Sequence, residues 1–352
     1  MYAENIFNIG GLSWDMKRFL RFSLPEKVFS RLIAIGAIFL LIISLLGCGP
    51  VSQQSSVLKI GMILGSGGLG DRSFNDSAYS GLLQAQQKFN VRFDTVDFAN
   101  QDSNLDALRL FARNRYDLII GIGFENQTNI AAAAKEFPDI RFALIDVTTP
   151  GDNIASVVYR EHEGDFLMGV LAAMLTKTKI VGIIGGMDIE TIKRIEEGFT
   201  QGVAYQDSNV AVLRDIAGTF SDPQAGKTLA LAQYAKGADI IHNAAGRTGL
   251  GIIEAARETT KYTTGTSGDQ RYLAPGNVIG NRPKRVDTAV IMLTEEVKTG
   301  TFKAGIRSLG LKENGITLGP FDESLVSKTV QNRLDDLKQK IIGGQIVIRV
   351  SR

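Results

Sequence analysis

From residue 57 onward, the chain alternates between short apolar runs and longer segments with apolar residues at helical spacing. The runs are rich in isoleucine, leucine and valine, which is typical of strands buried on both faces of a parallel sheet. The segments between them repeat apolar residues every three or four positions, which predicts amphipathic helices. This alternation predicts an α/β fold with doubly wound parallel sheets.

Two successive sets of these elements predict two similar lobes. The first set has predicted strands over 57–64, 91–98, 118–122, 142–146 and 155–159, and helices over 77–89, 103–114, 127–137 and 164–175. The second set has predicted strands over 180–185, 211–216, 240–243 and 262–265, and helices over 186–205, 222–234 and 249–260. A cleft between two lobes is a common place for a ligand.

Other segments join or follow these sets. The polar stretch 176–179 lies between them and is predicted to be the first crossover between the lobes. After Asn281, the pattern predicts amphipathic helices over 287–299 and 325–342 and a last strand over 345–350.

A glycine-rich turn follows the first predicted strand. Gly65, Gly67 and Gly70 match G-x-G-x-x-G, a pattern that brings backbone N–H groups close to a pyrophosphate at a helix N-terminus. The predicted helix begins several residues later, however, and Asp71 and Asp76 crowd the place that a phosphate would occupy. The turn therefore allows two interpretations, the dinucleotide loop of an NAD-binding enzyme or a loop that holds another small molecule.

The residues just after this turn are candidates for ligand contact. In an open α/β sheet, ligands bind at the carboxyl ends of the strands, in the loops that lead into helices. Asp71, Arg72, Phe74 and Asn75 occupy such a loop. We therefore expect them to lie where a small molecule is held.

The first part of the chain has the features of a lipoprotein signal peptide. Basic residues over 16–31 precede an apolar core over 32–46 that is too short for a comfortable membrane span. Leu45-Leu46-Gly47-Cys48 resembles the lipobox of bacterial lipoproteins, in which the cysteine becomes the acylated N-terminus. We predict a signal peptide over 1–47, with Met16 as a plausible start, lipidation of Cys48 and a linker over 48–56. A lipid-anchored protein at a bacterial membrane, facing the periplasm or the cell surface, is expected.

Composition disfavours several functional classes. The chain has 39 Lys and Arg and 37 Asp and Glu, and the first 47 residues hold five of the former and three of the latter. The remainder is thus balanced in charge and has no general attraction for nucleic acid. Cys48 is the single cysteine, and with 2 His no Ser-His-Asp set or metal cluster can be assembled from the sequence. A binding protein without a cofactor is expected rather than an enzyme.

Five motifs stand in an order that resembles a known family. They are D-R-S-F-N-D-S-A-Y-S-G-L over 71–82, Y-R-E-H-E-G-D-F-L-M-G over 159–169, G-T-F-S-D-P-Q over 218–224, A-A-G-R-T-G over 244–249 and P-K-R-V-D over 283–287. Together they resemble the basic membrane protein family of bacterial lipoproteins, which includes the purine nucleoside receptor lipoproteins of spirochaetes. The resemblance runs from about Leu58 to the C-terminus.

The resemblance implies a periplasmic-binding-protein fold of the first type, with two lobes joined by three crossing segments. One lobe is then expected to contain 57–176 and 283–301, and the other 180–282 and 302–352. The implied ligand is a purine nucleoside or a related ribose-bearing solute. The implied partners are the permease and ATPase subunits of an ABC importer.

The resemblance also implies roles for individual residues. Phe74 matches an aromatic side chain that stacks on the base, with Asn75 beside it. Asp146 matches a carboxylate that binds ribose hydroxyls. Asp269 and Lys284 match an acidic and basic pair that completes the ribose and base contacts.

Three further residues are expected at the ligand. His242 stands where the nucleoside receptors carry the second aromatic of the base sandwich. Gly246 lies in the fourth motif, and Phe220 is expected either to line the cleft or to pack within the second lobe.

Three departures from the nucleoside receptors, His242 in place of an aromatic among them, leave the ligand open. Gly65 stands where those receptors carry an acidic residue that bonds the base, and 265–267 reads Gly-Thr-Ser in place of Gly-Val-Asp. The ribose side is thus predicted to be kept and the base side altered. The alternative to a nucleoside-binding transport protein is a surface lipoprotein with a drifted pocket, acting as an adhesin or sensor.

Overall fold

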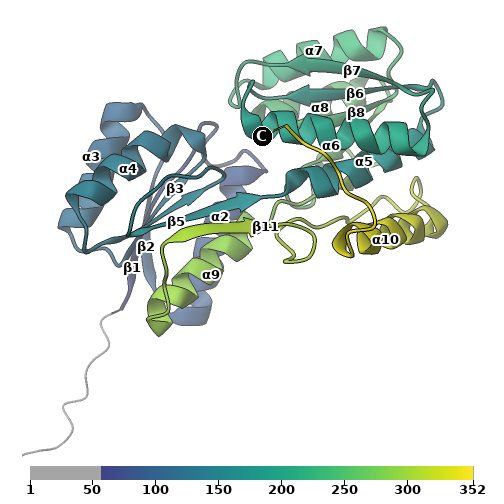
Figure 1. Ribbon diagram of the computed structural model, residues 1–352. Helices are drawn as coiled ribbons and strands as arrows, with labels where there is room; N and C mark the ends of the chain where they lie inside the picture. The colour runs from purple at the N-terminus through teal and green to yellow at the C-terminus, as the bar shows by residue number, and fades with distance from the viewer. Residues whose placement is uncertain (1–56, 352) are drawn as a thin grey trace, which may run out of the picture. The chain divides into compact units, whose positions relative to one another are not determined.

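The computed structural model describes residues 57–351 (Figure 1). The predicted signal peptide, the lipid site at Cys48 and the linker lie outside the described residues. Residues 57–351 form two parallel sheets, each with helices on both faces. This confirms the predicted fold class of two doubly wound α/β lobes.

The first lobe is built on a six-stranded parallel sheet in the order β11-β5-β4-β3-β1-β2. Its strands are β1 (Lys59–Ile63), β2 (Arg92–Val96), β3 (Leu118–Ile122), β4 (Arg141–Ile145), β5 (Ile154–Tyr159) and β11 (Gly305–Leu309). Helices α2 (Phe74–Phe89) and α9 (Val286–Thr299) cover one face of the sheet, and α3 (Gln101–Arg113) and α4 (Gln127–Glu136) cover the other.

Alternate residues of the central strands fill the two cores of this lobe. Ile60 and Met62 pack with Leu82 on the side of α2 and α9, whereas Ile63 packs with Phe111 on the side of α3 and α4. This follows from the strand period of two, which sends successive side chains to opposite faces. Both faces are apolar, which explains why the central strands read as uninterrupted apolar runs.

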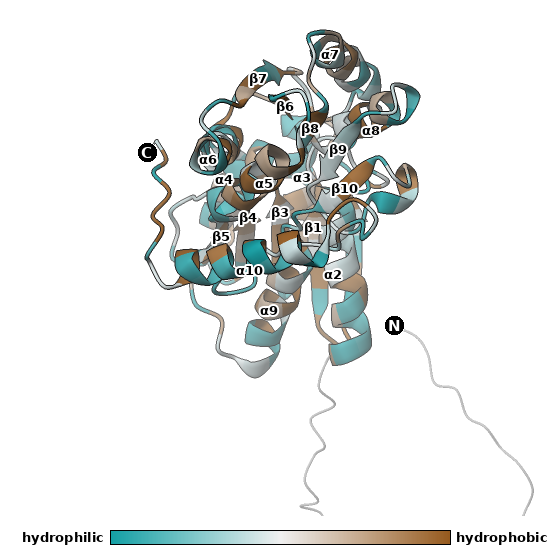
Figure 2. Cartoon of the chain, turned by 90° about the vertical axis from the view of Figure 1, so that its right-hand side faces the viewer, coloured by the Kyte–Doolittle hydropathy of each residue, from teal (hydrophilic) through white to brown (hydrophobic). Residues whose placement is uncertain are grey.

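The second lobe has a five-stranded parallel sheet in the order β10-β9-β8-β6-β7. Its strands are β6 (Ile180–Gly185), β7 (Ala211–Ile216), β8 (Ile240–Ala244), β9 (Tyr262–Gly265) and β10 (Val278–Asn281). Helices α5 (Glu161–Leu175) and α6 (Glu190–Gln206) cover one face, and α7 (Pro223–Ala235) and α8 (Gly249–Glu258) cover the other. Helix α10 (Lys328–Ile342) packs on α5 and buries Leu334, Leu337 and Ile341, while the rest of its surface is largely hydrophilic (Figure 2).

Helix α5 belongs to the second lobe, where it crosses α6 at very short range. A methyl group added at Gly202 would lie 1.9 Å from the backbone oxygen of Phe166, and one at Gly169 would lie 2.1 Å from that of Phe199. The chain therefore enters the second lobe between β5 and α5, at Arg160. The predicted crossover at 176–179 and the predicted lobe boundary at 176 are therefore wrong. The helical pattern of α5 indicates a helix, but it does not show which sheet that helix covers.

The last part of the chain also differs from the expected division of the lobes. The resemblance places residues 302–352 in the second lobe, but β11 pairs with β5 and forms the edge of the first sheet. The chain then returns to the second lobe for α10, so that it passes between the lobes three times within residues 57–351. The predicted strand over 345–350 is not a strand, and Gln201 of α6 bonds both backbone groups of Arg349 instead.

Candidate functional site

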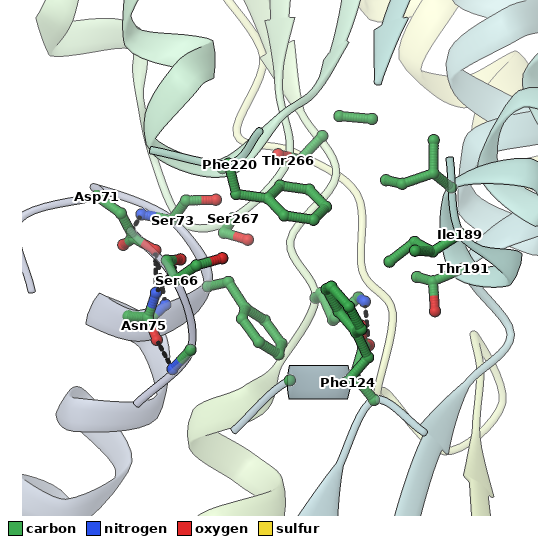
Figure 3. A pocket seen from close by; sticks show the side chains of 18 of the residues that line it. Ser66, Asp71, Ser73, Asn75, Phe124, Ile189, Thr191, Phe220, Thr266 and Ser267 are labelled. Carbon is green, nitrogen blue, oxygen red and sulfur yellow. Dashed lines mark hydrogen bonds and ion pairs between the residues drawn. The ribbon is translucent and has the colours of Figure 1, made fainter. Parts of the chain in front are cut away.

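A pocket lies where the carboxyl ends of the two sheets face each other. The first lobe contributes the turn after β1, the start of α2 and the turns after β3 and β4. The second lobe contributes the start of α6 and the segments after β7, β8, β9 and β10. This is the position at which open α/β sheets bind ligands. Figure 3 shows side chains from both lobes converging on this space.

Aromatic and aliphatic side chains form much of the pocket wall. Phe74, at the first position of α2, and Phe220, after β7, both line it and are half-buried. The ring of Phe220 projects into the space, and Ile189 and Thr191 face it from the start of α6 (Figure 3). Phe220 therefore lines the cleft, the first of its two expected positions. Such walls suit a flat apolar ring system.

Lys284 and Asp146 form an ion pair at the pocket. The Lys284 Nζ lies 2.5 Å from Asp146 Oδ1 and 3.0 Å from Glu161 Oε1, and all three side chains are nearly buried. Burial alone would lower the pKa of Lys284, but the two carboxylates outweigh it and raise that pKa above its ordinary value. The same ammonium group lies 5.3 Å from the ring centre of Phe74. The structure thus brings together three residues that sequence reasoning placed at the ligand.

Asp146 has an unusual backbone conformation. Its φ is +94°, a region that non-glycine residues rarely adopt, and its backbone N–H donates to Val157 at 2.8 Å. Strained residues of this kind persist where the surrounding structure holds them, often at ligand sites. The conformation presents the carboxylate to Lys284.

His242 does not line the pocket, contrary to the expectation that it is the second aromatic of a sandwich. Its ring is fully buried in β8, stacked on Phe199 with centroids 4.8 Å apart. The Nε2 is 2.8 Å from Asp165, and Nδ1 is 2.6 Å from the hydroxyl of Thr264. Burial lowers the pKa of His242, so the neutral ring donates from Nε2 to Asp165 and accepts from Thr264. The residue lies before the strand end, and its side chain points to the face covered by α5 and α6.

Asp165 also holds Arg282. The guanidinium Nε lies 2.8 Å from Asp165 Oδ1, and Arg282 is 1% exposed. Arg282 lines the pocket, although the sequence analysis did not select it. The residue directly follows the end of β10, and because the sequence does not predict that strand, no strand-end signal marked Arg282.

Asp269 also lies outside the pocket. Its carboxylate makes two 2.9 Å contacts with the guanidinium of Arg271, which lowers the pKa of Asp269. The side chain is 44% exposed. The neighbouring residues Thr266 and Ser267 line the pocket in its place. The short loop after β9 turns Asp269 outward, which a motif match alone could not show.

Asn75 and Asp71 line the pocket but serve mainly to hold the loop. Asp71 accepts hydrogen bonds from the backbone N–H groups of Ser73 and Asn75, both at 2.8 Å, and burial raises its pKa. The Asn75 amide donates to Asp71 at 3.0 Å and accepts from the Gly65 N–H at 2.9 Å. These bonds position Phe74 at the start of α2.

Gly246 lines the pocket as expected.

The glycine-rich turn is not arranged to bind a pyrophosphate. The N–H groups of Gly70 and Arg72 donate to Asp76 at 2.7 and 3.1 Å, and that of Ser66 donates to Glu125 at 3.3 Å. Because carboxylates already occupy these donors, an anionic ligand would be repelled rather than bound. The dinucleotide interpretation of this turn is therefore not supported by its geometry.

Glu125 is a second pocket residue that sequence reasoning missed. It lies in η1 (Phe124–Asn126), directly after β3, and its carboxylate accepts a hydrogen bond from the hydroxyl of Ser66. A methyl group added at Gly65 would lie 3.7 Å from Glu125 Oε2. The side of the pocket that lacks an acid at position 65 therefore has a carboxylate from the segment after β3. The signal was its position after the apolar run 118–122.

Two hydrogen bonds join the lobes beside the pocket. The Arg247 Nη1 donates to the backbone oxygen of Gly67 at 2.8 Å, and the Gln270 Nε2 donates to that of Arg72 at 2.8 Å. Each links a loop of the second lobe with the turn between β1 and α2. The lobes are thus closed on the pocket.

Two α/β lobes that close on a pocket at facing strand ends define a two-lobed solute-binding protein. The family model described as "ABC transporter substrate-binding protein PnrA-like" (Bmp) matches residues 58–351. The chain belongs to this family. That confirms the resemblance to the basic membrane proteins, and the family is one of substrate-binding proteins rather than enzymes.

Individual relatives agree with this assignment. Basic membrane protein A of Borreliella burgdorferi is 33% identical over 308 residues, which cover 85% of this chain and 90% of that protein. The "ABC transporter nucleoside-binding protein BmpA" of Lactococcus lactis is 31% identical over 351 residues, covering 90% and 98%.

Solved structures show the same architecture. A solute-binding protein of an ABC transporter system from Aeropyrum pernix has a TM-score of 0.77 and 29% identity, covering 84% of this chain and 94% of that one. One from Conexibacter woesei has a TM-score of 0.71 at 22% identity, covering 84% and 99%, and supports the fold alone. Among residues 57–351, no helix is long and apolar enough to span a membrane, and no cluster of acidic, His or Cys side chains could hold a metal ion.

Proposed function

We propose that this protein is the lipid-anchored, extracytoplasmic component of an ABC importer and that it binds a nucleoside between its lobes. The observation that carries the proposal is a pocket lined by Phe74 and Phe220 that also holds the Lys284–Asp146 ion pair. The name of the Lactococcus relative supports the same ligand class. The permease and ATPase subunits would receive the ligand, which the protein binds and releases without converting it.

The two kinds of wall suit the two parts of a nucleoside. A base in contact with an aromatic face gains about 1–3 kcal/mol from stacking. Ribose hydroxyls can donate to Asp146 and accept from Lys284, and hydrogen bonds with charged partners contribute about 1.5–3 kcal/mol. Closure of the lobes excludes water and strengthens both contributions.

A thermal-shift and calorimetry panel on residues 51–352 tests this proposal. It would contain adenosine, guanosine, inosine, pyrimidine nucleosides, free bases, ribose and NAD. A ligand at 100 times its Kd should stabilise the native state by about 2.7 kcal/mol, which is a shift of several degrees in Tm. Binding of nucleosides but not ribose supports transport. If no nucleoside binds, the result favours the alternative that the protein is an adhesin or sensor.

The lipid anchor is tested separately. In the full-length protein expressed in bacteria, we expect mass spectrometry to find a diacylglyceryl group on Cys48 and the variant C48A to leave the membrane fraction. An unmodified cysteine in a membrane-bound protein would contradict this part of the proposal.

A further inference from the structure

Glu125 presents an unpaired carboxylate oxygen at the pocket. Its Oε1 accepts from the N–H of Ser66 at 3.3 Å and from the Ser66 hydroxyl. Within residues 57–351, no donor or cation reaches Oε2. By contrast, Asp146 is paired with Lys284, and Asp71 is surrounded by N–H groups of its own loop.

The free oxygen lies beside the edge of the Phe74 ring. A methyl group added at Gly123 would lie 2.6 Å from Glu125 Oε2 and 3.7 Å from Cε1 of Phe74. Both groups therefore border the same small volume, which stays open because residue 123 is a glycine. A flat ring stacked on Phe74 would point one edge at this carboxylate.

The sheet order indicates which edge that is. The strands run β4, β3, β1, with Asp146 after β4 and the Glu125 carboxylate directed from β3 toward Ser66 after β1. The ion pair and the free carboxylate are thus separated across β3. In a purine nucleoside, the sugar nitrogen and the Watson–Crick edge lie at opposite ends of the base. With the ribose at Asp146 and Lys284, the Watson–Crick edge faces Glu125.

We propose that Glu125 determines specificity and that the preferred ligands are 6-oxopurine nucleosides, an inference that rests on the proposed nucleoside function. A carboxylate only accepts hydrogen bonds. Guanosine offers it two adjacent donors, N1–H and the 2-amino group, and inosine offers N1–H. Adenosine offers it a single donor, the 6-amino group, and turns the lone pair of N1 toward the carboxylate, where two acceptors oppose each other at a cost in affinity.

The test measures Kd for guanosine, inosine and adenosine by calorimetry on the wild-type protein and on E125Q. We expect wild type to bind guanosine at least tenfold more tightly than adenosine, with inosine between them. The amide of E125Q can donate to N1 of adenine, so guanosine affinity should fall at least tenfold while adenosine affinity holds or rises. General damage to the pocket would weaken all three ligands together.

The matched control is D152N, which removes an exposed carboxylate of the same lobe and should leave the ratio unchanged. Equal affinity of the wild type for adenosine and guanosine, or an unchanged ratio in E125Q, would overturn the role of Glu125 and leave nucleoside binding intact. Failure of every nucleoside to bind wild type would overturn the proposed function and this inference with it. Wild-type selectivity tests the predicted preference for 6-oxopurine nucleosides even if E125Q does not fold.

Discussion

Lys284 shows how one buried side chain links stability with ligand binding. It neutralises Asp146 and Glu161, two carboxylates that reach it from different lobes. Removing one partner of a buried ion pair leaves an uncompensated charge, which is more costly than losing the attraction itself.

For this reason, K284M should lower the free energy of unfolding by about 3–5 kcal/mol and abolish nucleoside binding. Urea unfolding followed by circular dichroism measures the first effect. Adding D146N and E161Q should restore part of the stability but not the binding. A single variant as stable as wild type would show that Lys284 is not needed to neutralise this cluster.

His242 predicts how stability depends on pH. Burial lowers the pKa of His242 in the folded state, whereas in the unfolded chain the pKa is about 6.5. The unfolded state therefore binds more protons below that pH, and the contribution of His242 to stability, full above about 6.5, is lost as the pH falls.

We expect the unfolding free energy of wild type to drop more steeply between pH 7 and pH 5 than that of H242Q. Burial also lowers the pKa of His162, which acts in the same direction. The variant H162Q serves as the control because it keeps the contribution of His242 to the pH dependence of the unfolding free energy. Parallel pH profiles for wild type and H242Q would refute the assignment.

At the scale of elements, the crossing of α5 and α6 depends on glycine. Alanine is the better helix former by about 1 kcal/mol, so G202A would stabilise an isolated helix. In the protein its methyl group would meet the backbone of Phe166, which cannot rotate away.

G202A should therefore lower Tm despite the better helix propensity, by an amount equivalent to about 1–3 kcal/mol. K193A, at an exposed position of the same helix, should leave Tm nearly unchanged. Calorimetry measures the Tm of both variants, G202A and K193A. A stabilised G202A would mean that the helices can separate without cost.

The sequence predicted the central strands well because both of their faces are buried. It missed β10 and β11, edge strands that are short or carry polar residues such as Arg307, and Ile306 is 67% exposed. Residues 345–350 have an apolar pattern but find no partner strand. Local pattern shows that a segment suits a strand, whereas pairing depends on the whole fold.

The site was predictable to the extent that it follows strand ends. Phe74, Asp146 and Lys284 lie at the pocket because motif position and strand topology agree there. His242 and Asp269 could not be placed, since one residue along a strand or loop reverses the direction of a side chain. Glu125 is held at the pocket by Ser66, a contact between the segments that follow two different strands, β3 and β1.

At the scale of the whole molecule, Arg247 and Gln270 hold the lobes closed. Bonds that exist only in the closed state shift the equilibrium toward it and slow the release of ligand. They do not contribute to the fold of either lobe.

R247A should thus raise Kd several-fold, mainly by faster dissociation, with little change in the Tm of the ligand-free protein. Surface plasmon resonance with immobilised protein gives both rate constants. R257A, an exposed arginine of the same lobe, is the control. An unchanged dissociation rate would exclude a closing role for Arg247.

Because the chain passes between the lobes three times, the first lobe depends on segments that are synthesised late. Helix α9 covers the face of the first sheet beside α2, and β11 completes its edge, yet both follow the whole β6–β10 region in sequence. On the ribosome, the first half of the polypeptide therefore waits with an uncovered apolar surface until residue 309 has emerged. Folding of the first lobe can therefore finish only after the β6–β10 region, α9 and β11 have been synthesised.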